Sequence, residues 1–280
     1  MKTIAIPVYN EEKSIEKTIC SITPQINKED EIFVVASGCT DKTIPILKRL
    51  SKKDRRVKIL IQKNREGKAS AINLIFKKSK GSIIIFTDGD VLLDKNAIKN
   101  LIKKMNKDIG AISGRNMPYK EDNFFDKLQS FSWKILNNKK IKEQKKEKFF
   151  ALNGYLFALK KGIINHLDTK NLIEDALIGW KIRKKGYSTI YEPNAKVYIK
   201  APQNLKDYLN QKKRIRLGWW QMTKQGVNPV KNENKGFIKY LFTDLYAWPY
   251  LFLELYCIIA SYIDFKRRKI YWKQIKSSKI

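Results

Sequence analysis

Cysteine and histidine are scarce in this sequence of 280 residues. The three cysteines, Cys20, Cys39 and Cys257, lie far apart and form no CxxC pair, which argues against a disulfide framework and against a cysteine zinc site. His166 is the single histidine of the sequence. Because it lies in an expected loop before the acidic pair Glu174-Asp175, we interpret it as a polar surface residue rather than as a metal ligand.

A long apolar run is missing from the start of the chain. Residues 1–10 read as a strand that runs into polar residues. They lack the apolar stretch of a signal peptide, so we expect the N-terminal part to stay in the cytoplasm. Internal repeats and low-complexity linkers are missing as well. We therefore expect one main domain over residues 1–230, followed by a helical C-terminal region over residues 231–280.

Negative charge is the third shortage, since 27 acidic residues face 58 lysines and arginines and the formal net charge is +31. The positive excess is +10 over residues 1–110, +10 over 111–200 and +11 over 201–280 (23 basic against 13 acidic, 19 against 9, and 16 against 5). Charge spread so evenly forms no basic arm, and it suits an anionic membrane surface or anionic substrates at least as well as DNA. Two alternatives stay open: a lysine-rich composition with no specific partner, and a non-catalytic basic protein that binds membranes or nucleic acid.

Short apolar runs alternate with helical patterns through the first 110 residues. The runs are rich in Ile and Val and nearly continuous, as expected of strands buried on both faces. Between them apolar residues recur at spacings of three and four, as in Ile15, Ile19 and Ile22. This alternation predicts βαβ units and a parallel sheet. The expected strands are Thr3–Val8, Glu31–Ala36, Val57–Ile61 and Ser82–Thr87.

The pattern loosens after Gly110. We expect a polar, basic helix over about residues 122–148, an apolar run over Phe149–Leu159 and a helix that begins near Glu174. Two expected strands, Ser188–Tyr191 and Lys196–Ile199, and an expected helix over Asn204–Lys224 complete the main domain.

The segment Phe237–Ile263 is apolar and rich in aromatic residues. Its 27 residues would span about 40 Å as a helix, enough to cross a bilayer once. The charges of Lys239, Asp244 and Glu254 would be costly at the bilayer centre. One crossing would also put the main domain and the basic cluster at residues 266–269 on opposite sides, although both favour the cytoplasm. We therefore expect one or two helices in the membrane interface, and an apolar helix pair packed on the main domain is the alternative.

Asp88-Gly89-Asp90 directly follows the fourth expected strand. Two carboxylates at the end of a buried strand lie at the edge where open α/β sheets bind ligands. Oxygen ligands of this kind suit Mg²⁺ or Mn²⁺, which substrate phosphates would also hold. For such a pair taken alone, an ordinary turn is the alternative.

Three further motifs carry weaker signals. Gly67-Lys68 opens a helix whose free N–H groups favour an anion, although the P-loop spacing is missing and an exposed lysine at a helix start is the alternative. Glu174-Asp175 begins a helix, where the helix dipole favours acidic residues without any catalytic role. Gln211, Arg214 and Arg216 lie close together on a helix, where guanidinium groups suit diphosphate oxygens. A solvated basic face is the alternative there.

Together and in this order, the motifs resemble those of the family-2 glycosyltransferases, whose catalytic domain has the nucleotide-sugar fold called GT-A. The resemblance runs from Ile4 to about Gly218. The matching motifs are residues 6–12 (IPVYNEE), residues 37–43 (SGCTDKT), Gly67-Lys68-Ala69, Asp88-Gly89-Asp90, Asn153-Gly154, Glu174-Asp175 and residues 211–215 (QKKRI).

This resemblance implies an α/β fold of the GT-A type, with a mixed, mostly parallel sheet flanked by helices and a C-terminal apolar helical segment. It implies inverting transfer of a hexosyl or N-acetylhexosaminyl group from a nucleotide diphosphate donor, without a glycosyl-enzyme intermediate. The implied metal, Mg²⁺ or Mn²⁺, lies at Asp88 and Asp90. Asp175 is the implied general base, with Glu174 beside it, and Asn153 and Gly154 lie on the acceptor side. The implied donor-binding residues are Pro7, Tyr9, Glu11, Ser37, Gly67, Lys68, Asp88, Gln211, Arg214 and Arg216.

The sequence departs from the family pattern at two places. Ala36 and Ser37 stand where the family often has aspartates, one of which pairs with the donor base, so the base stays open. Ile215 stands where a tryptophan positions the acceptor in processive polymer synthases, although Trp219 and Trp220 follow one turn later. Processive synthesis is therefore the less favoured alternative, also because the chain is short for an export channel. We expect a glycan or lipid-linked acceptor, peripheral or monotopic attachment to the cytoplasmic face of the cell membrane, and no nucleic-acid partner.

Overall fold

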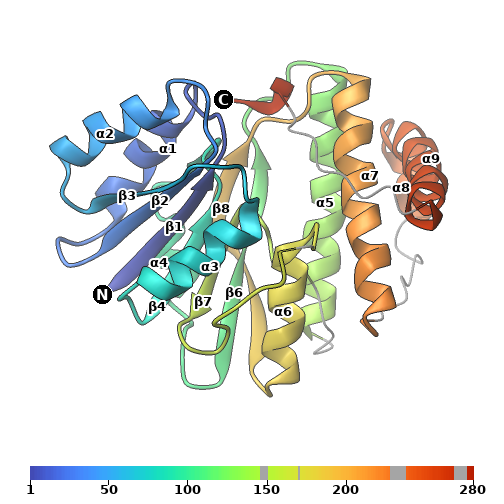
Figure 1. Ribbon diagram of the computed structural model, residues 1–280. Helices are drawn as coiled ribbons and strands as arrows, with labels where there is room; N and C mark the ends of the chain where they lie inside the picture. Colours follow the sequence, from blue (N-terminus) through green and yellow to red (C-terminus); the bar gives the residue numbers. More distant parts are fainter. Residues whose placement is uncertain (146–150, 170, 228–237, 268–275) are drawn as a thin grey trace.

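The computed structural model describes residues 1–145, 151–169, 171–227, 238–267 and 276–280 (Figure 1). The strands are β1 (Lys2–Val8), β2 (Glu31–Ser37), β3 (Val57–Gln62), β4 (Ile83–Thr87), β5 (Val91–Leu93), β6 (Ile109–Pro118), β7 (Leu156–Lys160) and β8 (Ser188–Ile199). The helices are α1 (Ile15–Ile22), α2 (Thr43–Lys53), α3 (Lys68–Lys78), α4 (Ala97–Ile102), α5 (Phe124–Lys145), α6 (Glu174–Lys184), α7 (Leu205–Lys224), α8 (Ile238–Thr243) and α9 (Ala247–Lys266), with short 3₁₀ turns at Thr23–Gln25 and Lys276–Ser278.

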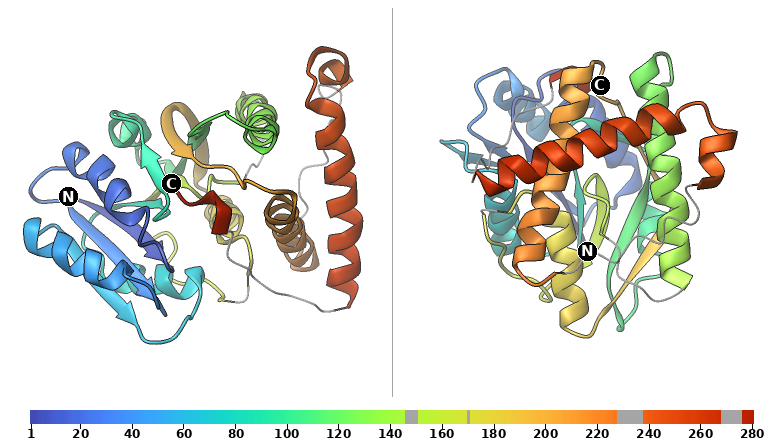
Figure 2. Two further views of the ribbon diagram at one scale, coloured as in Figure 1. Left: turned by 90° about the horizontal axis from the view of Figure 1, so that it is seen from above. Right: turned by 90° about the vertical axis from the view of Figure 1, so that its right-hand side faces the viewer.

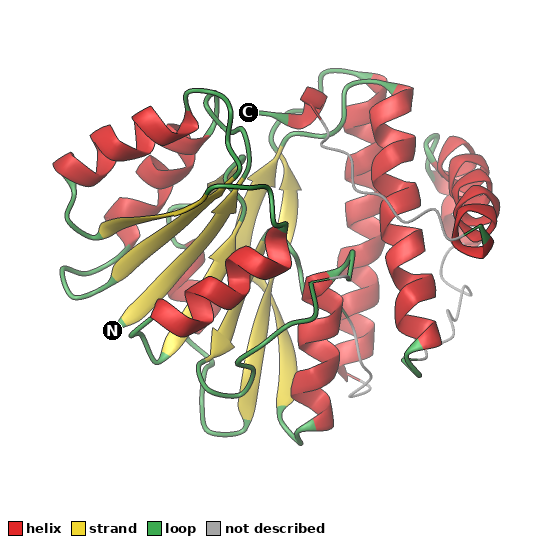
Figure 3. Cartoon of the chain, viewed as in Figure 1, coloured by secondary structure: helices red, strands yellow, loops and turns green. Residues whose placement is uncertain are grey.

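The strands form one mixed sheet in the order β3-β2-β1-β4-β7-β6-β8-β5, with helices packed on both sides (Figure 3). The first four strands of this order run parallel to one another, β7 is antiparallel to both of its neighbours, and β6 and β8 are parallel. The expected mixed, mostly parallel α/β sheet is confirmed. Its parallel half comes from the βαβ alternation, and the antiparallel strand β7 lies where the sequence pattern loosens. The short strand β5 pairs antiparallel with β8 at the edge of the sheet.

Both faces of the sheet are buried, as the near-continuous apolar strands predict. Ile4, Ile6 and Val8 of β1 pack with α1, α2 and α4 in one core cluster. Ala5 between them faces the opposite cluster, which includes α3 and α6. Alternate residues of one strand thus hold two helical layers against the sheet. The carboxyl ends of β1, β2 and β4 are thereby fixed side by side, where the candidate site residues lie.

The two strands expected over residues 188–199 are one strand, β8. Its pairing with β6 shifts register between Ser113 and Arg115, and an irregularity of this kind lets one strand pass through a polar stretch. The helix expected near residues 122–148 is α5, and residues 146–148 lie outside the described residues, as does the start of the apolar run at Phe149. Asn204 caps α7 by accepting a hydrogen bond from the Asp207 amide at 2.9 Å.

At the C-terminal end, α8 and α9 pack beside α5 and α7. Figure 2 shows α9 as a diagonal strap across both of these helices, and α9 contacts each of them. Among the described residues, no helix combines the length and the apolar character that a bilayer crossing requires. The boundary expected at residue 230 and the second half of the basic cluster at residues 266–269 lie outside the described residues. The division into two regions therefore stays a prediction.

Candidate active site

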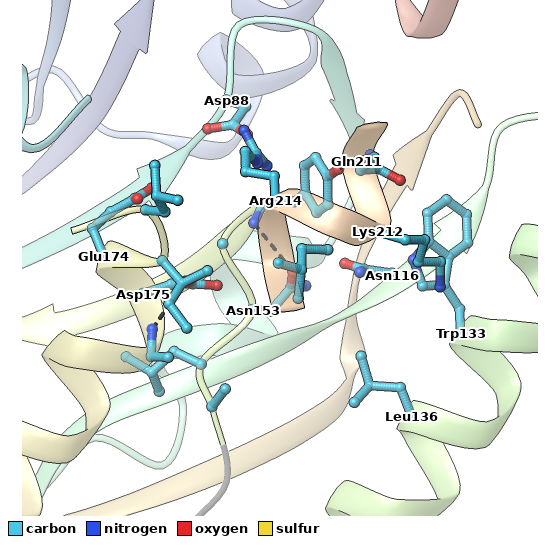
Figure 4. A pocket seen from close by; sticks show the side chains of 18 of the residues that line it. Asp88, Asn116, Trp133, Leu136, Asn153, Glu174, Asp175, Gln211, Lys212 and Arg214 are labelled. Carbon is cyan, nitrogen blue, oxygen red and sulfur yellow. Dashed lines mark hydrogen bonds between the residues drawn. The ribbon is translucent and has the colours of Figure 1, made fainter. Parts of the chain in front are cut away.

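All residues that the sequence predicts for the site line one cavity of about 1250 Å³. The cavity lies at the carboxyl ends of β1, β2 and β4 and continues toward α5, α7 and α9. Figure 4 shows Asp88, Glu174 and Asp175 on one side, Lys212 and Trp133 on the other, and Arg214 and Asn153 between them. By contrast, His166 is exposed in the loop before α6 and does not line the cavity.

Lys68 joins three of the predicted motifs. At the start of α3, its ammonium group lies 2.8 Å from an Asp88 carboxylate oxygen and 3.0 Å from a Glu174 carboxylate oxygen. It also donates to the Gly154 carbonyl at 3.3 Å. Although burial disfavours its charge, the carboxylates of Asp88 and Glu174 hold the pKa of Lys68 above its ordinary value. Motifs that lie far apart in the chain thus converge on one cation.

The turn at Asp88-Gly89-Asp90 is packed tightly against β1 and the loop that follows it. A Cβ atom on Gly89 would lie 2.6 Å from Val8 Cγ1 and 3.2 Å from Glu11 Cγ, so only glycine fits there. Glu11 is buried close to Asp90. Burial and the Asp90 carboxylate raise the pKa of Glu11 to about 8.

The carboxylates of this turn fit a divalent cation that shares its ligands with a bound diphosphate. Among the described residues, no group of three or more His, Cys, Asp or Glu side chains forms a closed metal cage. Mg²⁺ and Mn²⁺ do not need one, because they bind through one or two carboxylates together with substrate phosphates. Asp90 already contacts a cationic group, the ammonium of Lys279, at 3.3 Å. The donor set and its surroundings therefore suit a hard cation.

Asp175 lies in the first turn of α6, where one of its carboxylate oxygens accepts from the Ala176 amide at 2.9 Å. A Cβ atom on Gly154 would lie 2.8 Å from the other oxygen, so the glycine leaves room for the carboxylate. Burial, reinforced by the neighbouring Glu174 carboxylate, raises the pKa of Asp175 to about 6. At neutral pH the group is ionised and still basic enough to accept a proton.

Asn153 holds the turn that presents Gly154. Its backbone amide donates to Ser113 Oγ at 2.8 Å, and its side-chain amide donates to the Gly114 carbonyl at 3.1 Å. Its side-chain oxygen accepts from the Tyr155 amide at 3.1 Å. Of the predicted acceptor-side pair, Asn153 therefore fixes the backbone of the turn, and Gly154 faces Asp175.

β1, β2 and the loop before α3 form the end of the cavity where the sequence predicts donor binding. The Arg65 guanidinium stacks on the Tyr9 ring, 4.1 Å from its centroid. Ser37 Oγ accepts from the Glu66 amide at 3.0 Å, so this hydroxyl fixes the loop. Gly38 has a φ of +66°, and a Cβ atom there would lie 2.5 Å from the Arg65 backbone nitrogen, which explains the glycine.

Helix α7 contacts the site carboxylates' neighbourhood through one set of residues and α9 through another. Gln211 donates to the Tyr155 hydroxyl at 3.2 Å, beside the carboxylates. Lys212 and Arg216, one turn apart, both pair with Glu254 of α9, at 3.1 Å and 2.5 Å. The structure therefore places Arg216 in the cavity wall toward α9, and its contact with a donor diphosphate stays a prediction.

Sequence reasoning missed four residues that the fold brings to the cavity. Arg65 stacks on Tyr9, Tyr155 contacts Gln211, and Lys140 of α5 contacts Ser113 Oγ at 3.3 Å. Lys279 contacts both Glu11 and Asp90. A lysine in a lysine-rich chain carries no signal of its own, so tertiary contacts alone identify Lys140 and Lys279.

Known proteins share this architecture. The sequence model described as Glycosyl transferase family 2 matches residues 3–168, more than half of the chain. A poly-beta-1,6-N-acetyl-D-glucosamine synthase of Staphylococcus aureus is 24% identical over 209 residues, covering 72% of this chain and 50% of the relative. The Staphylococcus epidermidis enzyme of the same name is 23% identical over 269 residues, covering 92% and 65%. The chain thus spans about half the length of the curated relatives it matches.

Solved structures agree on the fold. A mannosyltransferase from Pyrobaculum calidifontis, in complex with GDP-Man and Mn²⁺, superposes with a TM-score of 0.70 at 21% identity and covers 98% of this chain and 76% of its own. Glucosyl-3-phosphoglycerate synthase from Mycobacterium tuberculosis, with Mn²⁺, UDP and phosphoglyceric acid, gives 0.57 at 16% identity, covering 82% and 80%. The chain belongs to glycosyl transferase family 2 and has its GT-A fold.

Proposed function

We propose that this glycosyltransferase moves a hexosyl or N-acetylhexosaminyl group, with inversion, from a nucleotide diphosphate donor to a hydroxyl or phosphate of a lipid-linked acceptor. The observation that carries the proposal is the convergence on Lys68, which contacts Asp88, Glu174 and the Gly154 carbonyl in one cavity. This convergence brings a metal motif and a base motif within reach of one sugar. Family membership supports transfer from a nucleotide sugar and leaves the non-catalytic alternative without support.

On the donor side, the base and ribose lie against Pro7, Tyr9, Glu11, Ser37 and Gly67, with Arg65 as a further platform. Asp90, with Asp88 beside it, would hold Mg²⁺ or Mn²⁺, which would supply positive charge to the leaving diphosphate. Lys68, Arg214 and Gln211 point polar groups into the same part of the cavity and stabilise the charge that develops there. Arg216 adds positive charge farther along α7.

On the acceptor side, Asp175 accepts the proton of the attacking hydroxyl while its oxygen forms the bond to the anomeric carbon. Its pKa of about 6 leaves it ionised before the reaction. Glu174 keeps that pKa high and holds Lys68 in place. Asn153 and Gly154 shape the turn against which the acceptor lies.

The cavity also supports an amphiphilic acceptor. It continues under α9, where Trp133, Tyr250, Leu251 and Ile258 line it. On its outer side, α9 exposes a stripe of large apolar residues, which are Trp248, Phe252, Leu255, Tyr256, Ile259, Tyr262 and Ile263. Such a face, on a chain with a net charge of +31, suits peripheral or monotopic attachment to the anionic cytoplasmic face of a membrane. A lipid-linked acceptor would then reach Asp175 along the apolar wall.

Nucleotide release tests this function. The purified protein, with Mn²⁺ and vesicles carrying a polyisoprenyl phosphate or a lipid-linked sugar, is incubated with a panel of nucleotide sugars. We expect one or a few donors to give acceptor-dependent release, and an anomeric configuration in the product opposite to that of the donor. Retention of configuration would contradict the inverting mechanism, and activity on water-soluble acceptors alone would contradict the lipid-linked acceptor.

A further inference from the structure

The segment Lys276–Ile280 lies against the sheet edge where the predicted metal ligands are found, near the C label in Figure 1. Ser277 anchors it. The Ser277 hydroxyl donates to an Asp207 carboxylate oxygen at 2.6 Å, the Ser277 amide donates to the same oxygen at 3.2 Å, and the hydroxyl accepts from the Gln203 amide at 3.0 Å. Two residues later, the Lys279 side chain enters the cavity.

The Lys279 ammonium group bridges two carboxylates inside that cavity. It forms a short contact with Glu11 and lies 3.3 Å from an Asp90 oxygen. The ammonium offsets the repulsion between these two carboxylates, which lie close together at the cavity wall.

A divalent cation on Asp90 would meet the same carboxylate and would likewise supply positive charge there. The ammonium group and the cation therefore compete for one position. We propose that Lys279 occupies the cation position of the free enzyme as an internal substitute, so that residues 276–280 have to move away before the metal site is loaded. This inference rests on the proposed assignment of Asp90 as a metal ligand.

Binding of Mn²⁺ in the absence of any donor tests the inference. Where a competing conformation fills the site about nine-tenths of the time, the apparent dissociation constant is about tenfold higher than the intrinsic one. We therefore expect Lys279→Ala to lower the apparent dissociation constant for Mn²⁺ about tenfold, measured from the electron paramagnetic resonance signal of free Mn²⁺. Lys52→Ala removes the same charge from an exposed position on α2 and should leave the constant unchanged.

Ser277→Ala offers a second test that keeps the ammonium group. Loss of the two hydrogen bonds of its hydroxyl should loosen the segment and lower the apparent dissociation constant in the same direction, by a smaller factor. Binding of UDP at saturating Mn²⁺ tests a different role, in which Lys279 contacts the diphosphate. If Lys279→Ala weakened that binding several-fold, Lys279 would be a ligand of the diphosphate rather than a competitor of the cation.

The outcomes separate the inference from the function on which it rests. Wild-type protein that binds Mn²⁺ with an affinity unchanged in Lys279→Ala would overturn the inference and leave the metal site standing. No Mn²⁺ binding by wild type or variant, together with full transfer in the presence of a chelator, would overturn both. Tighter Mn²⁺ binding in Lys279→Ala and Ser277→Ala, with Lys52→Ala unchanged, is the result that the structure predicts.

Discussion

At the scale of single residues, Asp175 and Glu174 share a helix start but have different surroundings. The Asp175 carboxylate lies against Gly154, and burial and Glu174 raise its pKa to about 6. Glu174 is paired with Lys68 at 3.0 Å. The helix dipole alone would explain two acids in a first turn. It does not explain why, within one cavity, one of them faces Gly154 while the other pairs with Lys68.

If Asp175 is the base, Asp175→Asn should lower turnover by about a hundredfold or more, the range of general-base catalysis. The dissociation constant for the nucleotide donor should change little, because Asp175 faces the acceptor. Single-turnover kinetics and donor titration measure the two quantities separately. A variant with normal turnover and poor donor binding would make Glu174-Asp175 a structural feature of α6.

The pH dependence of kcat/KM for the acceptor should report the pKa of Asp175. Since the base acts in its deprotonated form, kcat/KM should rise with pH through about 6. Lys140 lowers this pKa and Glu174 raises it. Lys140→Met should therefore move the acidic limb to higher pH, and Glu174→Gln should move it to lower pH. Shifts in the same direction for both variants would contradict the assignment.

Gly154 is predicted to matter through its missing side chain. In Gly154→Ala the new Cβ atom would lie 2.8 Å from an Asp175 carboxylate oxygen, so Asp175 has to move. Misplacement of a reacting group by about 1 Å costs on the order of a hundredfold in rate. We expect a large fall in turnover with nearly normal donor binding. Gly162→Ala is the comparison, because nothing lies within 4 Å of a Cβ atom there, although its φ of +90°, unlike that of Gly154, is unusual for alanine.

At the scale of elements, the sequence predicts the strands and helices that depend on local pattern. The apolar runs of β1 to β4 and the spacing of Ile15 and Ile19 report burial directly. The same pattern reads β8 as two strands, because pairing with β6 across the irregularity near Ser113 is a tertiary effect. The site residues likewise fall into those that a local sequence pattern reveals and those that only the packing of elements reveals. Motif residues such as Asp88 are visible in the sequence, whereas Arg65 and Lys140 depend on which elements pack together.

The α9 strap is predicted to depend on one buried carboxylate. Although burial opposes it, the charges of Lys212 and Arg216 lower the pKa of Glu254 to about 2. Glu254→Gln leaves these cations without their partner and should destabilise the fold by about 3 kcal/mol. Urea unfolding measures this value. Asp264→Asn breaks a more exposed pair on the same helix, 3.0 Å from Lys213, and should cost less than about 1 kcal/mol.

The pH dependence of stability provides a check on Glu254. Because the pKa of Glu254 is depressed in the folded state, its contribution to stability is full above its ordinary value of 4.5 and is lost as the pH falls toward about 2. Wild-type protein should lose stability across this window more steeply than Glu254→Gln. Parallel curves for the two proteins would show that the ion pairs contribute little to holding α9.

At the scale of the whole molecule, the cavity with the predicted site residues and an exposed apolar helix face lie on the same side of the protein. The cavity runs from the carboxylates to the wall formed by α9, and the outer face of α9 exposes Phe252 and Ile259 at 64% and 61%. The overall charge of +31 is spread along the chain. Composition predicts the charge, but only the packing of α9 across α5 and α7 shows which face is apolar.

Membrane attachment is tested by binding to vesicles that contain anionic lipid. Phe252→Ser with Ile259→Ser removes two exposed apolar side chains, and burial of each is worth about 1.5–3 kcal/mol. We expect the partition coefficient to fall by at least about tenfold. Ile61→Ser makes a similar change at an exposed position of β3, 53% exposed, and should bind as the wild type does. Equal loss in both proteins would contradict an attachment through α9.

We expect the Asp88-Gly89-Asp90 turn to hold the cation on which transfer depends. Mn²⁺-dependent nucleotide release by Asp90→Asn, compared with Asp94→Asn, tests this role. Asp94 undergoes the same chemical change four residues later and does not line the cavity. We expect Asp90→Asn to lose transfer while keeping the wild-type unfolding transition, since the carboxylate lies beyond the end of β4, and Asp94→Asn to stay active. Near-full, Mn²⁺-dependent transfer by Asp90→Asn would show that Asp90 does not hold the cation that transfer requires.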